Sequence, residues 1–251
     1  MAVRAVPAGG ASDMDIQHPE LLPDATMDRA DMLAVQASVR ERAIFDDGFE
    51  SPGSNGTVVG ADLAFDDDEA VAAAVAMRDD EQIDEAVVRR PISIPYIPGL
   101  LAFREAGPMI RAIAALDVSW DVLLCDGNGR IHPRQAGLAT HIGVTIDRPT
   151  IGVAKSLLCG ELVDPPPEPY PEGTTIPIVA DDDAETVIGY AVQTRQWDRE
   201  DRSINPVYVS PGHRMSAEQA TDLVMSCTAG YKLPEPIRKA DQLASRAARE
   251  R

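Results

Sequence analysis

The chain has 251 residues, of which 44% are hydrophobic, and its 41 acidic and 23 basic side chains give a formal net charge of −18. This length suits one large core or two small ones, and no stretch has the roughly 20 apolar residues that a membrane span needs. The first residues contain no apolar signal segment, so we expect a cytoplasmic protein with no membrane partner.

The acidic residues gather where loops are expected, as in residues 66–68 and 181–183, which is typical of a solvated surface. Such acidity would ordinarily make a chain a poor nucleic-acid binder. We hypothesise a high-salt cytoplasm, where screening shortens the reach of surface charge, and a salt titration of folding tests this. Lysine occurs only at Lys155, Lys232 and Lys239, and the three cysteines fit neither a zinc site nor a disulfide framework.

Residues 1–25 show no periodicity and are predicted to be a mobile leader, and residues 26–251 are predicted to form one catalytic domain. Apolar residues at helical spacing predict a helix over 27–45. Three strands over 57–65, 70–78 and 85–93, joined by short acidic turns, predict an antiparallel meander. A helix from 99 or 100 to 116 follows, and Pro108 is expected to kink or break it.

An apolar run over 121–125 predicts a buried strand that ends on Asp126, and a second run over 150–154 ends on Lys155. A helix over 135–146 connects them. Further along we expect a hairpin over 174–180 and 186–194, a short strand over 207–209, a helix from Ser216 to Cys227, and a final polar helix or tail. This order predicts the α/β class, with a mixed sheet flanked by helices in a single domain.

Three acidic residues are candidates for a site. Asp62 lies inside a predicted strand, where a buried carboxylate is unfavourable unless it is paired or binds a metal; an edge strand with Asp62 facing water is the alternative. Asp126 ends a buried strand beside Gly127, where open α/β sheets place their chemistry, although a solvated turn would have the same pattern. Glu105 lies on a helix face that can look back at the sheet, and an ordinary surface position is the commoner meaning.

If the first and fourth strands are neighbours, Asp62 and Asp126 meet, with Glu105 above them. Converging carboxylates repel one another and need divalent cations, and Mg²⁺ suits an all-oxygen site. Such ions activate water and stabilise the leaving oxygen in phosphodiester cleavage. Lys155 would bind a phosphate or position the water, and His132 and His213 could transfer protons or contact phosphate.

The loop over 95–99 reads Pro-Tyr-Ile-Pro-Gly, and its two prolines stiffen it. Its tip presents Tyr96 and Ile97. Rigid apolar tips of this kind can wedge between bases, but both side chains could equally pack into the core.

The chain resembles the endonuclease V family, which has a ribonuclease H-like fold, over roughly residues 30–245. The segments that carry the resemblance are Gly60-Ala61-Asp62, 95–99, Leu101 with Phe103-Arg104-Glu105, 126–129, His132-Pro133-Arg134, Gly137-Leu138-Ala139, 152–155 and 210–214. It implies Asp62, Glu105 and Asp126 as ligands of Mg²⁺, with Mn²⁺ as a substitute. Lys155, His132 and His213 would support them.

The resemblance also implies a strand-separating wedge of Pro95, Tyr96, Ile97 and Pro98. The groups around Gly99, Leu101, Gly127 and Leu138 would then form the pocket for a flipped base. The implied partner is DNA containing deoxyinosine, and the implied role is DNA repair by a monomer. The enzyme would hydrolyse the second phosphodiester 3′ to the lesion and leave 3′-hydroxyl and 5′-phosphate ends.

One residue departs from the family pattern, because Asn128 stands where a histidine is expected. Three alternatives stay open. The same site could act mainly on inosine-containing RNA or on mismatched or branched DNA. The chain could be a non-catalytic module that binds lesions. The metal could serve structure alone.

Overall fold

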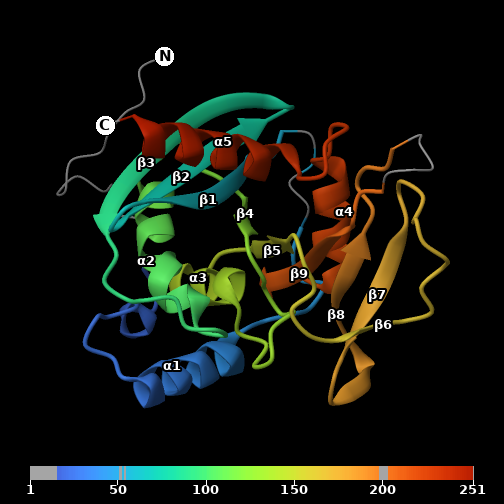
Figure 1. Ribbon diagram of the computed structural model, residues 1–251, viewed down its shortest axis with the longest axis horizontal. Helices are drawn as coiled ribbons and strands as arrows, with labels where there is room; N and C mark the ends of the chain where they lie inside the picture. The colour runs from blue at the N-terminus through green and yellow to red at the C-terminus, as the bar shows by residue number, and fades with distance from the viewer. Residues whose placement is uncertain (1–15, 51–52, 54, 198–202, 251) are drawn as a thin grey trace.

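The computed structural model describes residues 16–50, 53, 55–197 and 203–250 (Figure 1). In these residues one mixed sheet has the strand order β3-β2-β1-β4-β5-β9-β8-β7-β6. The strands are β1 (Val58–Asp66), β2 (Glu69–Arg78), β3 (Glu81–Pro91), β4 (Val122–Asp126), β5 (Thr150–Ala154), β6 (Glu161–Leu162), β7 (Thr175–Ala180), β8 (Asp183–Val192) and β9 (Val207–His213). The predicted meander is β1 to β3, and the predicted pairing of the first and fourth strands is confirmed.

Helices cover both faces of the sheet (Figure 1). The helices are α1 (Arg29–Arg42), α2 (Leu101–Ala114), α3 (Leu138–Ile146), α4 (Ala217–Ser226) and α5 (Glu235–Arg249). Strand residues alternate between the faces, so Ala72 and Ala74 of β2 pack with α2 while Val71 and Ala73 pack with α5. Helix α1 lies outside this arrangement, against α3. The α/β class and the mixed sheet flanked by helices are confirmed.

Two local predictions need correction. Helix α2 continues through Pro108 without a break, because buried residues on both sides of the proline, Ala106 and Met109, hold it against the sheet. The strand expected to end at residue 209 runs on to His213, because Ser210 and Pro211 still pair with β5.

The segment before α1 also differs from the expectation of a mobile leader. Leu21, in a short 3₁₀ turn (Pro19–Leu21), is only 2% exposed and packs against α1 and α3. The N–H of His18 donates to the carbonyl of Thr145 at 3.0 Å, and Nε2 of His141 lies 2.7 Å from the carbonyl oxygen of Leu21. Residues 16–25 are therefore bound to the domain, and residues 1–15 lie outside the described part.

No helix in the described ranges is both long enough and apolar enough to cross a membrane.

The first turn of α5 lies directly on β1. A Cβ atom added at Gly60 would come within 2.1 Å of the backbone of Pro236, so only glycine permits this approach. Because Asp62 is two residues further along β1, its side chain points to the same face and toward α5.

We expect Gly60→Ala to lower the free energy of unfolding by about 1–3 kcal/mol, because α5 must move away from the sheet. The matched change Gly107→Ala in α2, where a Cβ would meet nothing within 4 Å, should raise it by about 0.5–1 kcal/mol. Urea unfolding measures both, and equal effects would contradict the close contact.

Candidate active site

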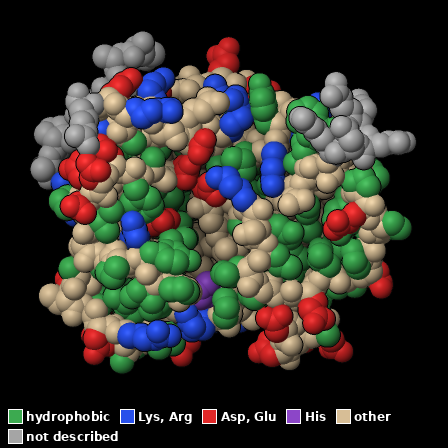
Figure 2. All heavy atoms as spheres, in the orientation of Figure 1, with side chains coloured by type: hydrophobic (Ala, Val, Ile, Leu, Met, Phe, Trp, Pro, Cys, Tyr) green, Lys and Arg blue, Asp and Glu red, His purple; other side chains and the backbone are tan. Residues whose placement is uncertain are grey.

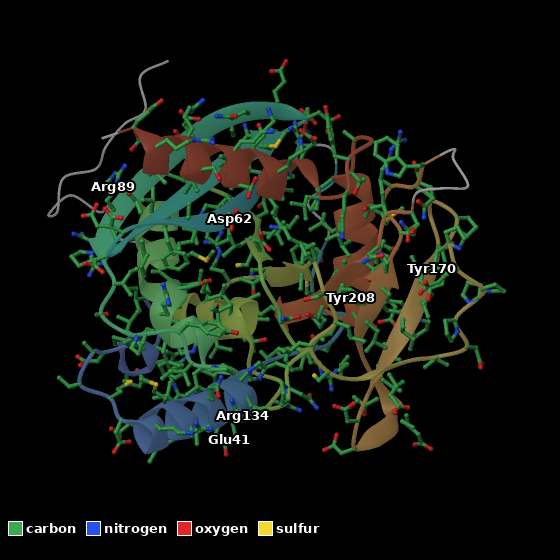
Figure 3. The ribbon with its side chains drawn as sticks, viewed as in Figure 1. Glu41, Asp62, Arg89, Arg134, Tyr170 and Tyr208 are labelled. Carbon is green, nitrogen blue, oxygen red and sulfur yellow. The ribbon has the colours of Figure 1, made fainter. Side chains whose placement is uncertain are left out.

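The parallel register of β1 and β4 places two carboxylates side by side. Ala61 pairs with Cys125, so Asp62 and Asp126 follow next to each other at the carboxyl end of β4. Asp62 is only 8% exposed, and its Oδ1 accepts a hydrogen bond of 2.7 Å from the N–H of Leu63. Figure 3 shows Asp62 on β1, near the middle of the sheet.

Negative charge is concentrated in this region. Burial raises the pKa of Asp62 to about 8, and the charge of Asp126 adds to that increase. Burial likewise raises the pKa of Glu105, on the second turn of α2, to about 7, with Asp126 again adding and Arg104 opposing. The predicted trio of carboxyl groups therefore interacts electrostatically, although Glu105 comes from the opposite face of the sheet.

Lys155 supplies the nearest positive charge. It follows β5, the neighbour of β4, and its Nζ lies 2.5 Å from Oδ2 of Asp126. Burial works to lower the pKa of Lys155, but the hydrogen bond to Asp126 and the charges of Asp126, Asp62 and Asp241 raise it overall. The ammonium group therefore stays protonated beside the carboxylates. Figure 2 shows acidic and basic side chains meeting around a hollow on this face.

Asp241 is a further acidic residue that acts on this region, and the sequence alone did not single it out. It lies on α5, and its charge contributes to the raised pKa of both Asp62 and Lys155. The sequence around it reads only as a polar helix or tail. The available signal was the buried stripe of α5, in which Ala240 and Ala244 face the sheet and so bring their neighbour Asp241 near β1.

A divalent cation suits the chemistry of this donor set. Among the residues described, no group of three or more His, Cys, Asp or Glu side chains is arranged to hold a metal ion. Yet Asp62 and Glu105 both have raised pKa values, which means that their negative charges lack full compensation. Carboxylate oxygens that have too little positive charge around them are suitable ligands for Mg²⁺.

His132 is held as a neutral side chain. Its Nδ1 accepts from the backbone N–H of Arg134 at 3.2 Å, so its Nε2 carries the proton and donates to the carbonyl of Gly99 at 3.1 Å. Burial lowers the pKa of His132 to about 4, and the nearby Arg134 contributes. In this arrangement His132 links two loops and is not placed to shuttle protons at neutral pH.

His213 lies away from the carboxylates. It pairs with Thr150, at the opposite end of β5 from Lys155, and the five residue steps from Thr150 to Lys155 span about 16 Å at about 3.3 Å per residue. Its Nδ1 accepts from the N–H of Ile44 at 3.2 Å, and its Nε2 donates to Oδ1 of Asp147 at 3.0 Å. The structure therefore places His213 at the other end of β5 from Lys155, where it bonds to Ile44 and Asp147, and the expected proton or phosphate role stays a prediction.

A pocket of about 210 Å³ opens beyond the ends of β4 and β5, and its lining includes Asn128, two residues after Asp126, and Ser156, the residue after Lys155. Three of the four predicted pocket residues, Gly99, Leu101 and Leu138, line it. The fourth, Gly127, is adjacent, since a Cβ there would lie 3.1 Å from Leu138. The full lining is Gln36, Tyr96, Gly99, Leu101, Ala102, Asn128, His132, Ala136, Gly137, Leu138, Ser156 and Leu158.

The two apolar side chains at the tip of the 95–99 loop, at the rim of this pocket, lie in different surroundings. Tyr96 is 61% exposed, whereas Ile97 is half-buried and packs against a cluster that includes Leu100 and Phe103. Pro95 and Pro98 are exposed. Of the two expectations for the tip, Tyr96 fits an exposed wedge and Ile97 fits core packing.

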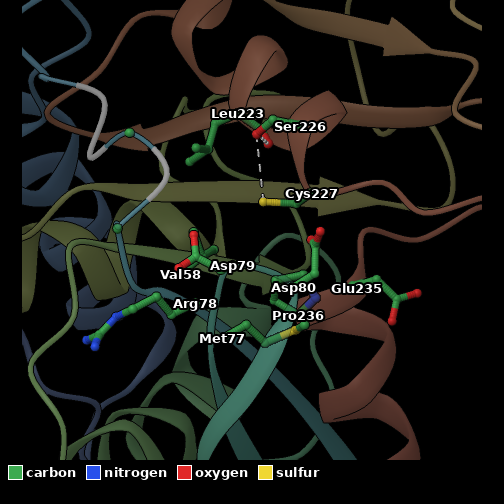
Figure 4. A pocket seen from close by; sticks show the side chains of 12 residues that line it. Val58, Met77, Arg78, Asp79, Asp80, Leu223, Ser226, Cys227, Glu235 and Pro236 are labelled. Carbon is green, nitrogen blue, oxygen red and sulfur yellow. Dashed lines mark hydrogen bonds between the residues drawn. The ribbon is translucent and has the colours of Figure 1, made fainter.

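A larger pocket of about 410 Å³ lies at the other end of β1, where Val58, Arg78 and Pro236 meet (Figure 4). Because Val58 begins β1, this pocket is at the opposite edge of the sheet from the carboxylates. Its acidic neighbours Asp79 and Asp80 belong to the β2–β3 turn. We therefore place the chemistry at the smaller pocket.

Comparison with known proteins identifies close relatives. A sequence model of the endonuclease V family matches residues 37–242. The chain is 46% identical to endonuclease V of Haloarcula marismortui over 91% of this chain and 96% of that protein. It is 47% identical to endonuclease V of Natronomonas pharaonis over 91% and 95%.

Solved structures agree with this. Endonuclease V of Streptomyces avermitilis is similar with a TM-score of 0.78 and 35% identity, over 99% of both chains. Endonuclease V of Ciona intestinalis, in complex with a 24mer DNA containing an inosine followed by a ribo-adenosine, has a TM-score of 0.71 and 28% identity over 87% of this chain and 96% of that chain. The expected ribonuclease H-like fold is confirmed.

The raised pKa values predict how stability depends on pH without metal. The folded state keeps protons on Asp62 and Glu105 that the unfolded chain, with ordinary values of 3.8 and 4.5, has released. The stabilising contribution is therefore present below about pH 4 and is lost as the pH rises through about 7 to 8. Urea unfolding in a chelator should show this decline, and Asp62→Asn should make it shallower. An unchanged slope in that variant would contradict the assignment.

Proposed function

This chain belongs to the endonuclease V family, and from that membership and its site we propose that it is a metal-dependent endonuclease for DNA containing deaminated bases. As a family member it is an endonuclease that acts on DNA. One observation supports the substrate class: a pocket of about 210 Å³ is lined by Asn128, two residues after Asp126, and by the exposed Tyr96. Enzymes that read a damaged base commonly take it out of the stack into such a pocket.

Asp62, Glu105 and Asp126 would hold Mg²⁺, for which Mn²⁺ would substitute. A bound ion supplies Lewis-acid activation of water and neutralises charge on the phosphate. Asp241 on α5 would add a further negative charge near the metal, since its charge already raises the pKa of Asp62. The carboxylates would be ionised in that state, because a nearby cation lowers the pKa values that burial raises.

The chain's own side chains would position the substrate. Lys155 would donate to a phosphate oxygen in place of its present bond to Asp126. Tyr96 would fill the gap left by the flipped base. The cut would fall at the second phosphodiester 3′ to the lesion and leave 3′-hydroxyl and 5′-phosphate ends, with the base still attached.

The formal net charge of −18 opposes binding of this protein to the negatively charged phosphate backbone of DNA. We propose that pocket, wedge and metal contacts carry more of the affinity here than in a basic nuclease. Homologues from halophilic organisms fit the hypothesis of a high-salt cytoplasm. The cytoplasmic location and the monomeric state stay predictions.

A second candidate substrate is inosine followed by a ribonucleotide, or inosine in RNA. The DNA bound in the Ciona intestinalis complex, with its ribo-adenosine after the inosine, favours testing it. Side-by-side assays of inosine in DNA, inosine in RNA and a plain mismatch separate these substrates.

We expect an end-labelled duplex with one deoxyinosine, in molar KCl with Mg²⁺, to be cut once, at the second phosphodiester on the 3′ side. A chelator should stop the reaction and Mn²⁺ should restore it. Asp126→Ala should abolish cleavage while the duplex still binds, because it removes a proposed metal ligand. Binding without a cut in either metal would instead support the lesion-binding module, and full activity of Asp126→Ala would remove this site from the chemistry.

We expect Tyr96→Ala to raise the KM for the inosine duplex by about tenfold, since base stacking on an aromatic ring contributes about 1–3 kcal/mol. A single strand with the same inosine needs no strand separation, so its KM should change less. Steady-state kinetics on the two substrates measures the difference. Equal changes on both would argue against a wedge.

A further inference from the structure

A glutamine outside the sheet reaches the base pocket. Gln36 lies on α1, which packs against α3 rather than on the sheet, yet its side chain lines the same pocket as Gly99 and Leu138. It is 1% exposed. The sequence around Gln36 predicts only a helix.

The side-chain amide of Gln36 makes three hydrogen bonds. Its Nε2 donates to the carbonyls of Gly99 at 3.0 Å and Ala136 at 3.2 Å. Its Oε1 accepts from Nε of Arg134 at 2.6 Å. The orientation of the amide is unambiguous, because carbonyls only accept and a guanidinium only donates.

The Gly99 carbonyl is the meeting point of these bonds. Besides Gln36, it accepts from Nη2 of Arg134 at 2.7 Å and from Nε2 of His132 at 3.1 Å. Gly99 has a φ of +74° and ends the 95–99 loop that carries Tyr96. Three donors from two other segments therefore hold the end of that loop in one place.

Gln36 thereby joins the walls of the pocket to one another. Gly99 belongs to the wedge loop, and Ala136 precedes α3, which carries Leu138. Arg134 lies in the loop after β4; Figure 3 shows it beside α1. One side chain of α1 therefore bonds to both the wedge loop and the β4–α3 loop, whereas none of its bonds goes to Asp62, Glu105 or Asp126.

We propose that Gln36 is a positioning residue that holds the wedge loop against the base pocket and so sets the discrimination between inosine and an undamaged base. This rests on the proposed function. Flipping a base out of the duplex costs the free energy of its stacking and pairing. The loop that takes the place of the base must therefore keep its position. A recognition site performs only as well as the side chains that fix its geometry.

The chain offers a matched control in Gln193. It is also 1% exposed, and its Nε2 also donates to two carbonyls, of Arg195 at 2.7 Å and Ile204 at 2.8 Å. It follows β8 and does not line the pocket. Gln36→Leu and Gln193→Leu therefore each remove two buried bonds to backbone carbonyls, and only Gln36→Leu also removes a bond from Arg134 and acts at the pocket.

The experiment compares single-turnover cleavage of duplexes with inosine or adenine at one position, over a range of enzyme concentrations, and thermal unfolding of each variant. We expect Gln36→Leu to reduce the inosine-to-adenine ratio by about tenfold through a weaker apparent Kd, with the maximal rate nearly unchanged. Gln193→Leu should lose less stability, because the Oε1 of Gln193 is buried without a hydrogen-bond partner, and it should keep the ratio. Gln36→Glu, which keeps the acceptor for Arg134 but loses both donors, should also lower the ratio.

Equal ratios in the Gln36 and Gln193 variants would overturn the inference, as would a loss confined to the maximal rate. If Gln36→Leu does not fold, Gln36→Glu decides; if neither folds while Gln193→Leu does, Gln36 serves the core and the inference fails. A wild-type protein that cleaves neither duplex, or both equally, would instead refute the proposed function.

Discussion

Two carboxylates placed side by side in a poorly solvated region are the constraint on which the site depends. Asp62 and Asp126 meet because β1 and β4 pair in parallel, and burial, with the charge of Asp126 adding to it, raises the pKa of Asp62 to about 8. Lys155 relieves part of the repulsion through Asp126. The fold holds these charges together because apolar residues on both faces of the central strands, such as Leu123 and Leu124, are fully buried.

The proposed recognition site uses a separate set of residues from the proposed chemistry. Asp62 lies in β1, Asp126 ends β4 and Glu105 lies on α2, whereas the pocket is made by loops around Gly99 and Ala136 and by helix α1. His132 belongs to this second set, since it is neutral and bonded to the Gly99 carbonyl. This separation means that substitutions in the pocket should alter substrate choice before they alter the rate of bond cleavage.

Acidic side chains occur in two different surroundings, in solvated turns and in the partly buried site. Acidic residues occupy turns such as Asp79–Asp80 and Asp181–Asp182, where water and salt can screen them. Inside the site the same sign of charge is screened poorly, so each acid acts on its neighbours. A strongly acidic surface and a carboxylate site can therefore occur in one protein. Repulsion between the surface charges is weak in water, whereas repulsion inside the site is stronger because the effective dielectric constant there is lower.

Local residue patterns and the resemblance were enough to predict the strands before Asp126 and Lys155, the proline-stiffened loop over 95–99 and the family. They could not predict that Asp241 lies near enough to act on Asp62, that Gln36 bonds to Gly99, or that His213 lies at the far end of β5. Local residue patterns determine the periodicity of one element and the chemistry of its side chains. Which side chains meet depends on strand register and on helix docking, here the contact of α5 with Gly60 and of α1 with α3, and these involve residues far apart in the chain.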